Sequence, residues 1–314
     1  ILVQYVPHAL GTRAVNLGFC WWLASLPKVS IDLMFHEVAL TPQLGWPLRR
    51  NALAAVQRLM ACLATRSASR IFVSIPAWRK TVAPWARDNA LVRWLPVPST
   101  VPVVEDDCAI SSTRRRLASN DAVAGHFGTY GSLSEILAHT IVDLCHRRGA
   151  VTVLLLGRGS CEFANDLIRR EPWLNGRLHA AGELTARDLS LHLSICDVML
   201  QPYPDGISTR RTSSMASLAH GRPIVTTSGH LTEPLWHKSS AIAIAPIAEP
   251  ARLVELTAEL LENSAVRSRM SVDARSLYDN CFDLRHTINA LRDTQDASIA
   301  QSQIESRNLA ATQS

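Results

Sequence analysis

The chain has 314 residues, of which 47% are hydrophobic and 19% are charged. This ordinary globular composition excludes a disordered chain and a fibrous repeat, and the length suits two α/β domains. The net charge of +5 comes almost wholly from arginine, because Lys28, Lys80 and Lys238 are the only lysines. Arginine binds phosphate well, but it cannot supply the amine that Schiff-base or pyridoxal-phosphate chemistry requires.

The mild basic excess fits phosphate ligands or an anionic membrane surface, whereas no run of Lys and Arg is long enough to indicate nucleic acid. The seven cysteines stand singly, with no CxxC pair, which is typical of reduced thiols in a cytoplasmic protein. The longest apolar stretch near the start, residues 17–26, has about half the length of a bilayer span. We therefore expect a cytoplasmic protein, and a peripheral position at the inner membrane face is left open.

The first third of the chain alternates β-rich runs with helical stretches. Strands are predicted at 2–6, 30–35 and 70–75, and helices near 15–24 and 48–65. Such alternation is typical of a parallel sheet with crossover helices. The chain opens directly in the strand-like run LVQYV with no Met, which predicts that upstream sequence is missing. The first domain, residues 1–95, is accordingly expected to be incomplete.

After residue 95 the pattern gives way to a stretch with several prolines and then a polar one, so residues 96–121 are predicted to be a linker. A second alternating series forms a domain over residues 122–280. Its strands are predicted at 125–128, 151–157, 177–181, 197–201, 223–227 and 241–245, and its helices at 133–147, 162–170, 186–195 and 210–220. Two helices are expected after the last strand. Residues 281–314 are predicted to hold a C-terminal helix and a polar tail that begins near Asp296.

The strand VTVLLLG is apolar without alternation, as expected when helices cover both faces of a parallel sheet. Ligands of open parallel sheets bind outside the carboxyl ends of the strands. Two such sheets therefore place ligands between the domains, and functional residues are sought in the loops that follow strands.

The richest of these loops lies in CDVMLQPYPDGISTRRTSSMASLAHGRPIVTT, residues 196–227. Ser208 or Thr209 is a natural N-cap for the following helix, which puts Arg210 and Arg211 in its first turn. Cations there oppose the helix dipole at a cost of roughly 0.3–1 kcal/mol each. A bound phosphate would reverse the sign, because backbone N–H groups and both guanidinium groups would then face an anion. The alternative is that both arginines face solvent or pair with nearby carboxylates.

The succession of strand, PYPDG, helix and MASLAHGRPIVTT resembles the donor-binding segment of retaining glycosyltransferases of family four, which have the B-type double-Rossmann fold. The resemblance implies an α/β fold of two Rossmann-like domains whose parallel sheets face a cleft. In that family an acid before a glycine faces the donor sugar, and Asp205 with Gly206 matches this position. A second acid, eight positions on, binds the nucleotide ribose. Ser213 stands there, and its hydroxyl is a weaker partner than a carboxylate.

Three glycine-containing turns extend the resemblance. FGTYG lies where the family has a turn that approaches the diphosphate, so Gly128, Tyr130 and Gly131 are candidate donor-binding residues. LLLGRG resembles the end of the next strand, whose loop walls the nucleotide, and AGEL resembles the segment beside the base. These motifs add Gly157 and Gly182. For FGTYG the alternative is a tight strand-to-helix turn without a ligand.

The first domain contributes SIDLMFHEV, which puts His36 and Glu37 at the end of an apolar strand. In the resembled family a histidine followed by an acid reaches from here toward the donor sugar, and a neutral imidazole can hydrogen-bond sugar hydroxyls. HEVAL lacks the second His of HExxH, so a metalloprotease helix is not supported. Glu233, in SGHLTEPLW, resembles an acid that the family places near the donor. Together with Asp205 it is also a carboxylate with which the arginines could pair.

These features predict a glycosyltransferase that uses a nucleotide-diphosphate sugar and retains the anomeric configuration, because the resembled family retains. His36, Glu37 and Asp205 are the candidate catalytic residues. The arginines and the helix start would neutralise the leaving diphosphate, so no metal or other cofactor is expected. The acceptor is a glycan, a lipid-linked glycan or a small molecule. A non-catalytic nucleotide-sugar-binding protein and a sugar-nucleotide epimerase on the same scaffold are the alternatives.

Overall fold

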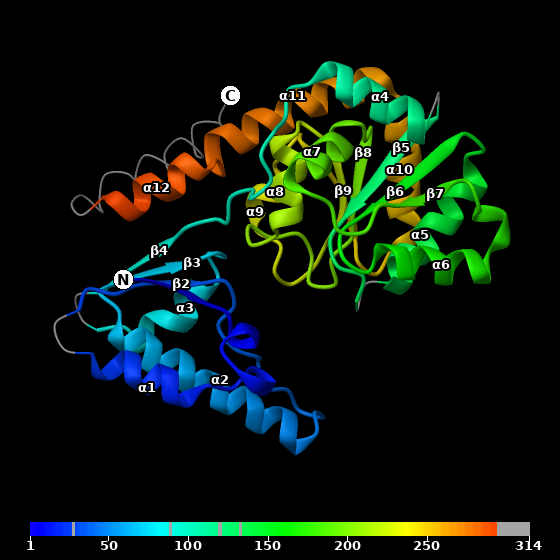
Figure 1. Cartoon of the computed structure of the whole chain (residues 1–314). Coiled ribbons are helices and arrows are strands. Elements are labelled where there is room, and N and C mark those ends of the chain that lie inside the picture. Colours follow the sequence, from blue (N-terminus) through cyan, green and yellow to red (C-terminus); the bar gives the residue numbers. More distant parts are fainter. Residues whose placement is uncertain (27–28, 88–89, 119–120, 132–133, 294–314) are drawn as a thin grey trace.

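The computed structural model describes residues 1–26, 29–87, 90–118, 121–131 and 134–293, and it contains one sheet of four strands and one of six (Figure 1). Within the described residues, every pair of neighbouring strands in both sheets is parallel. The two series of alternating elements predicted from the sequence therefore form two separate sheets, as expected.

The smaller sheet has the strand order β1-β2-β3-β4. Its strands are β1 (Leu2–Tyr5), β2 (Asp32–Phe35), β3 (Arg70–Val73) and β4 (Leu91–Trp94). The α-helices between them are α1 (Leu17–Ser25), α2 (Leu48–Ser67) and α3 (Trp78–Val82), and the short 3-10 helices are η1 (Pro7–Ala9), η2 (Thr12–Ala14) and η3 (Ala83–Trp85).

Successive side chains of β2 pack on opposite faces of the small sheet, as the two-residue period of a strand requires. Leu33 and Phe35 belong to the apolar cluster that α1, α2 and α3 cover, whereas Met34 belongs to a second cluster with Phe72 and Leu95. The second cluster is closed by residues of the last helix. Each face of this sheet thus has its own core.

The larger sheet has the order β10-β9-β8-β5-β6-β7. Its strands are β5 (Ala122–Phe127), β6 (Val151–Leu156), β7 (Leu178–Ala180), β8 (Val198–Gln201), β9 (Ile224–Ser228) and β10 (Ile242–Pro246). The helices of this half are α4 (Asp107–Leu117), α5 (Ser134–Arg147), α6 (Ser160–Arg170), η4 (Pro172–Leu174), α7 (Ala186–Ser194), α8 (Thr212–Ala219), α9 (Pro234–His237), α10 (Pro250–Glu262), α11 (Ser264–Cys281) and α12 (Leu284–Arg292).

This strand order is that of a Rossmann sheet, in which the chain starts in the middle and later crosses to the other side. The crossing lies between β5 and β8, which are neighbours although they are distant in sequence. Ligands of such sheets bind outside the carboxyl ends of the two strands at this switch point. Those ends carry FGTYG and PYPDG.

Two apolar clusters cover the faces of the larger sheet. Val153 and Leu155 of β6 point into one, with α5, α6 and α10, and Leu154 and Leu156 point into the other, with α8 and α11. The continuous apolar run predicted for this strand is therefore confirmed as a strand buried on both faces.

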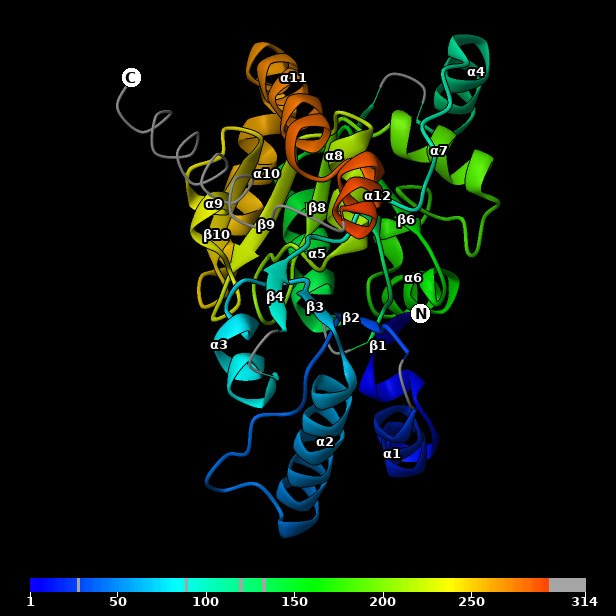
Figure 2. The same cartoon turned by 90° about the vertical axis from the view of Figure 1, so that its left-hand side faces the viewer.

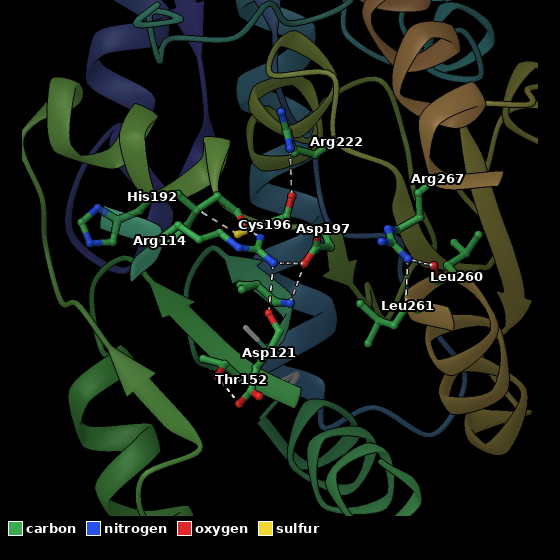
Figure 3. Close-up of polar contacts among 12 residues, drawn as sticks. Arg114, Asp121, Thr152, His192, Cys196, Asp197, Arg222, Leu260, Leu261 and Arg267 are labelled. Carbon is green, nitrogen blue, oxygen red and sulfur yellow. Dashed lines mark hydrogen bonds and ion pairs between the residues drawn. The ribbon is translucent and has the colours of Figure 1, made fainter. Parts of the chain in front are cut away.

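The segment predicted to be a linker contains α4, which is anchored to the larger sheet (Figure 3). Asp197 Oδ2 accepts hydrogen bonds from Arg114 Nη2 and from the backbone N–H of Val123, both at 2.8 Å, and Arg114 also donates to the carbonyl groups of Ile195 and Asp121. These contacts join α4 to the amino ends of β5 and β8. They hold the sheet at the amino ends of its strands, opposite the carboxyl ends that form the switch point.

The last helix, α12, returns to the smaller sheet, where Ala290 and Leu291 pack against Met34 and its neighbours. Arg70 of β3 donates to the backbone carbonyls of Leu291 and Asp293, both at 2.8 Å, and forms an ion pair with Asp32 of β2. The chain therefore passes from one half to the other twice.

The sequence predictions differ from the structure in a few elements. Strand β4 and helix α3 were not predicted, α4 lies inside the predicted linker, and three helices rather than two follow β10. The helix predicted at 210–220 begins at Thr212. Leu133 and the polar tail from Asp296 lie outside the described residues. Within the part of the chain that the structure describes, no helix has the length and apolarity needed to cross a bilayer.

We predict that Asp197→Ala lowers the free energy of unfolding by about 2–4 kcal/mol. The change leaves the Val123 N–H without its acceptor and the partly buried Arg114 guanidinium without its carboxylate partner, and an unpaired buried donor or charge is costly. Urea unfolding followed by circular dichroism measures the effect. Glu105→Ala, which removes an exposed carboxylate from the neighbouring segment, is the control, and an equal loss in both variants would contradict the prediction.

Candidate functional site

The candidate site lies where the loop after β8 meets the small sheet. This loop, residues 202–211, leaves β8 at the switch point and precedes α8. Its glycine, Gly206, has φ 85°, and a Cβ at this position would overlap Thr232 Oγ1 and the backbone of Gly229. Only glycine therefore fits this turn, and the turn places Asp205 on one side and Ser208 to Arg211 on the other.

Arg210 and Arg211 do not lie in the first helical turn as predicted. Arg211 is the N-cap of α8, without a side-chain capping hydrogen bond, and Arg210 lies in the preceding turn. The prediction of Ser208 or Thr209 as the N-cap was wrong, because α8 begins only at Thr212. The Thr209 hydroxyl instead contacts Ser74 of the other half of the chain. The uncapped start of α8 nevertheless leaves the positive end of the helix beside both arginines.

Both arginines pair with Asp205. Its Oδ2 accepts from Arg210 Nη2 at 2.9 Å and from Arg211 Nη2 at 3.1 Å. Arg210 Nη1 also donates to Glu37 Oε1 at 2.7 Å, and Glu37 follows β2 of the small sheet. The pairing with a nearby carboxylate, left open by the sequence, thus occurs with Asp205 and with Glu37 rather than with Glu233.

These ion pairs do not use all the donors of the cluster. Ser208 is fully buried and its hydroxyl has no partner, and Nε of Arg210 and Nε of Arg211 are also buried without a partner. The Arg211 guanidinium lies 4.5 Å from the centre of the Tyr203 ring. Burial, and then the neighbouring charge of Arg210, lower its pKa. Unpaired buried donors beside a second cation are what an anion of several oxygen atoms could satisfy.

Thr209 connects the loop to the small sheet and to Glu233. Its hydroxyl lies 2.5 Å from the Ser74 carbonyl oxygen and 2.5 Å from Glu233 Oε1, and Trp94 Nε1 donates to it. The hydroxyl has one hydrogen and the carbonyl can only accept, so both short contacts are satisfied when Glu233 is protonated and donates to Thr209. Burial raises the pKa of the Glu233 carboxyl, in agreement with this arrangement.

Glu233 is therefore occupied within the protein. Its Oε1 also accepts from the Thr209 N–H at 3.0 Å, and its Oε2 accepts from Trp236 Nε1 at 2.7 Å. Only 6% of the residue is exposed. The structure thus gives Glu233 a positioning contact with Thr209, and the position near the donor that the resemblance implies for it stays a prediction.

His36 is half-buried at the end of β2, next to Glu37, and its Nε2 is hydrogen-bonded to the Gln4 side chain. Burial lowers its pKa, and the charge of Glu37 opposes the shift. A neutral imidazole follows at neutral pH. His8, which lies in η1, has Nε2 3.7 Å from Glu37 Oε2.

Ser213 lies in the first turn of α8, and its hydroxyl is 2.8 Å from the hydroxyl of Tyr203. Tyr203 OH is also 2.8 Å from Ser214 Oγ, and the buried ring stands beneath Arg211. Tyr203 belongs to the PYPDG motif but was not selected from the sequence. Its position between the arginines and the helix start shows it to be part of the same cluster.

The three glycine turns lie at the carboxyl ends of β5, β6 and β7, as predicted. Gly157 has φ 103° and packs so closely on the Gly128 carbonyl that no Cβ fits, and its N–H donates to the Gly182 carbonyl. A Cβ at Gly131 would have no neighbouring atom within 4 Å. The protein's own packing therefore does not require a glycine at this position. Tyr130 packs against His126 and Phe163 and donates to the Leu156 carbonyl.

Sequence reasoning missed Ser74 and Trp94, which hold Thr209. Ser74 directly follows β3, so the rule that functional loops follow parallel strands could have found it. Trp94 ends β4, a strand that was not predicted. Among the residues that the structure describes, no group of three or more His, Cys, Asp or Glu side chains is arranged to hold a metal ion.

No protein-family model matches this chain, and no curated protein sequence matches it. Several solved structures are similar to this chain. HepE from Anabaena, solved with UDP and glucose, is similar with a TM-score of 0.63 and 18% identity, covering 84% of this chain and 71% of HepE. A sucrose-phosphate synthase from Thermosynechococcus elongatus has a TM-score of 0.66 and 15% identity, with 93% and 71% coverage.

WaaG, a glycosyltransferase involved in lipopolysaccharide biosynthesis, has a TM-score of 0.63 and 12% identity, with 86% of this chain and 79% of WaaG covered. At such identities the similarity concerns the fold. The predicted fold is confirmed: two parallel sheets in the arrangement of B-type glycosyltransferases.

We predict that Glu233→Ala lowers the free energy of unfolding by about 2–4 kcal/mol, since the Thr209 N–H and Trp236 Nε1 lose their acceptor. Because the pKa of Glu233 is raised in the folded state, its contribution is fully present below the ordinary value of 4.5 and is lost as pH rises through the raised value. Thermal unfolding of the wild type and of Glu233→Ala, measured from below pH 4.5 upward, gives the difference in stability between the two proteins at each pH. Glu249→Ala, an exposed glutamate, should show no such pH dependence, and a gap that widens with pH would refute the assignment.

Proposed function

We propose that this chain is a glycosyltransferase that takes a sugar from a nucleoside-diphosphate sugar, retains the anomeric configuration and needs no metal ion. The observation that carries the proposal is the set of unsatisfied donors at the switch point. Two adjacent guanidinium groups, the unpartnered Ser208 hydroxyl and the uncapped start of α8 gather at the carboxyl end of β8. This is the chemistry that a diphosphate recognises.

In this proposal Arg210, Arg211 and Ser208 bind the diphosphate and stabilise the charge that develops on it as the sugar leaves. A bound diphosphate would compete with Asp205 for the arginines, because Asp205 Oδ2 accepts hydrogen bonds from both of them. Release of Asp205 would free its carboxylate to face the donor sugar and stabilise positive charge on the ring.

His36 and Glu37 complete the site from the small sheet. The neutral imidazole favoured by burial of His36 can hydrogen-bond a sugar hydroxyl. Glu37 holds Arg210 across the two halves of the chain, so binding of the diphosphate and the relative position of the halves are linked. Ser213 would contact the ribose, with its hydroxyl set by Tyr203.

The similar structures support the class of ligand. HepE was solved with UDP and glucose and with UDP-glucose. We extend this class to the present chain as a proposal, with a glycan, a lipid-linked glycan or a small molecule as the acceptor. Ser213 in the place of an acid is compatible with a second candidate, a protein that binds a nucleotide sugar without turnover.

We predict that Arg210→Ala and Arg211→Ala each weaken the binding of a nucleoside diphosphate by about 10- to 100-fold, the range expected for charge-assisted hydrogen bonds. Isothermal titration with uridine, guanosine and adenosine diphosphates measures the affinities. Arg115→Ala, which removes an exposed arginine from α4, is the matched control. If neither site variant weakened the binding of any nucleotide that the wild type binds, the donor site would be elsewhere.

Turnover separates the candidate functions. Incubation of the chain with a panel of nucleotide sugars should release the nucleoside diphosphate, slowly even when water is the acceptor. Conversion of the sugar without release would indicate an epimerase. Binding with neither result, for every sugar in the panel and with added acceptors, would indicate a non-catalytic binding protein.

A further inference from the structure

Trp78 lies against the arginine pair from the small half of the chain. It is the first residue of α3, and the centre of its ring lies 5.8 Å from the guanidinium carbon of Arg210. Helix α3 lies closer to the larger half than α1 and α2 do, as two views show (Figures 1 and 2). A guanidinium group within about 6 Å of an indole ring is attracted by the electrons of that ring. The surroundings of Arg210 therefore include an aromatic ring as well as carboxylates.

The turn between β3 and α3 holds Trp78 in this place. Ser74 and Ile75 are fully buried, and the Trp78 N–H donates to the Ile75 carbonyl at 3.1 Å. The Ser74 carbonyl oxygen lies 2.5 Å from the hydroxyl of Thr209, the residue before Arg210. One short turn of the small half thus contacts two consecutive residues of the loop after β8.

The ring and the carboxylates hold Arg210 in different ways. The Arg210 side chain is 14% exposed, its Nη1 and Nη2 pair with Glu37 and Asp205, and its Nε is buried without a partner. The carboxylates accept hydrogen bonds from the N–H groups of the guanidinium. The indole has no acceptor atom, because its nitrogen is a donor only. Trp78 therefore attracts the cation without occupying an N–H group in a hydrogen bond to an oxygen.

Arg211 has the same kind of support from the larger half. Its guanidinium carbon lies 4.5 Å from the centre of the Tyr203 ring. Burial, and then the charge of Arg210, lower the pKa of Arg211, because two neighbouring cations repel each other. An aromatic ring beside each cation offsets part of this repulsion. The two rings belong to different halves of the chain, so each half supports one arginine of the pair.

We propose that Trp78 is a positioning residue that holds Arg210 for the diphosphate. Glu37 and Asp205 pair with N–H groups that a diphosphate also needs, so the diphosphate must displace them. The indole ring leaves these N–H groups free, so it keeps the guanidinium in place while one anion replaces another. This role rests on the proposed function, because it concerns binding of the diphosphate at the same site.

Packing alone is the alternative role for Trp78. Its ring also packs against the apolar cluster of the small half, as the ring of Trp85 does. Trp85 has a cation of its own, since the Arg58 guanidinium carbon lies 5.4 Å from its ring centre, and both residues lie outside the candidate site. Trp85 is therefore a matched control, with the same residue type, the same cluster and a similar contact with an arginine.

Isothermal titration measures the contribution of Trp78, with whichever of uridine, guanosine and adenosine diphosphate the wild type binds most tightly. Trp78→Leu should weaken binding by about tenfold, and Trp78→Phe, which keeps an aromatic ring, by less than about threefold. Trp85→Leu should stay within about twofold of the wild type, since it lies apart from the site. If circular dichroism shows that Trp78→Leu does not fold, Trp78→Met supplies a flexible non-aromatic side chain for the same comparison.

A double-mutant cycle separates positioning from packing. Because Trp78 acts through Arg210, adding Trp78→Leu to Arg210→Ala should weaken binding by no more than about a further twofold. A similar loss from Trp78→Leu in the wild type and in the Arg210→Ala background would show that the ring acts by packing alone.

The outcomes distinguish this role from the proposed function. Unchanged binding in Trp78→Leu, or an equal loss in Trp85→Leu, would overturn the role of Trp78 while Arg210→Ala still weakened binding. A phenylalanine variant as weak as the leucine variant would overturn it as well. A wild type that bound none of the three nucleotides, or an Arg210→Ala variant that bound them as the wild type does, would overturn the donor site and this role together.

Discussion

The contact of Thr209 and Arg210 with the small sheet is the interaction on which the candidate site depends. Thr209 bonds to the carbonyl that follows β3, and Arg210 pairs with the carboxylate that follows β2. The carboxyl ends of both sheets are thereby joined through two consecutive residues. Because Glu37 and Arg210 are 173 positions apart in sequence, neither half of the chain contains the charge cluster by itself.

Contacts within the protein hold this cluster in place. Tyr203 supports Arg211 from below, Asp205 fixes the guanidinium groups of both arginines, and Glu37 fixes that of Arg210. Preorganised donors need little rearrangement when charge develops on a substrate, which is the main source of electrostatic catalysis. An incoming diphosphate must partly break the same ion pairs. The ion pairs therefore orient the arginines but also lower the affinity of the site for the diphosphate.

The sequence predicted the parts of this arrangement that depend on local pattern. Apolar runs located nearly all the strands, and the rule for parallel sheets placed the loops of Gly128 and Asp205 at the switch point. Prediction from the sequence failed where tertiary contacts decide the local structure. Thr209 cannot cap α8, because its hydroxyl is used by Ser74 and Glu233. Strand β4, LVRW, leads directly into the stretch LPVPSTVP, whose prolines argue against a strand. The pairing of Glu37 with Arg210 follows from the packing of two sheets and has no local pattern at all.

The return of α12 has a consequence for how the protein can be divided. The apolar side chains of Met34 and Phe72 are covered by a helix that comes from the far end of the chain, and Arg70 donates to the backbone at the end of that helix. A fragment cut after β4 would leave this face of the sheet in water. A chimera that exchanges one half for another must therefore carry α12 together with β2 and β3, although more than 200 residues separate β3 from α12 in sequence.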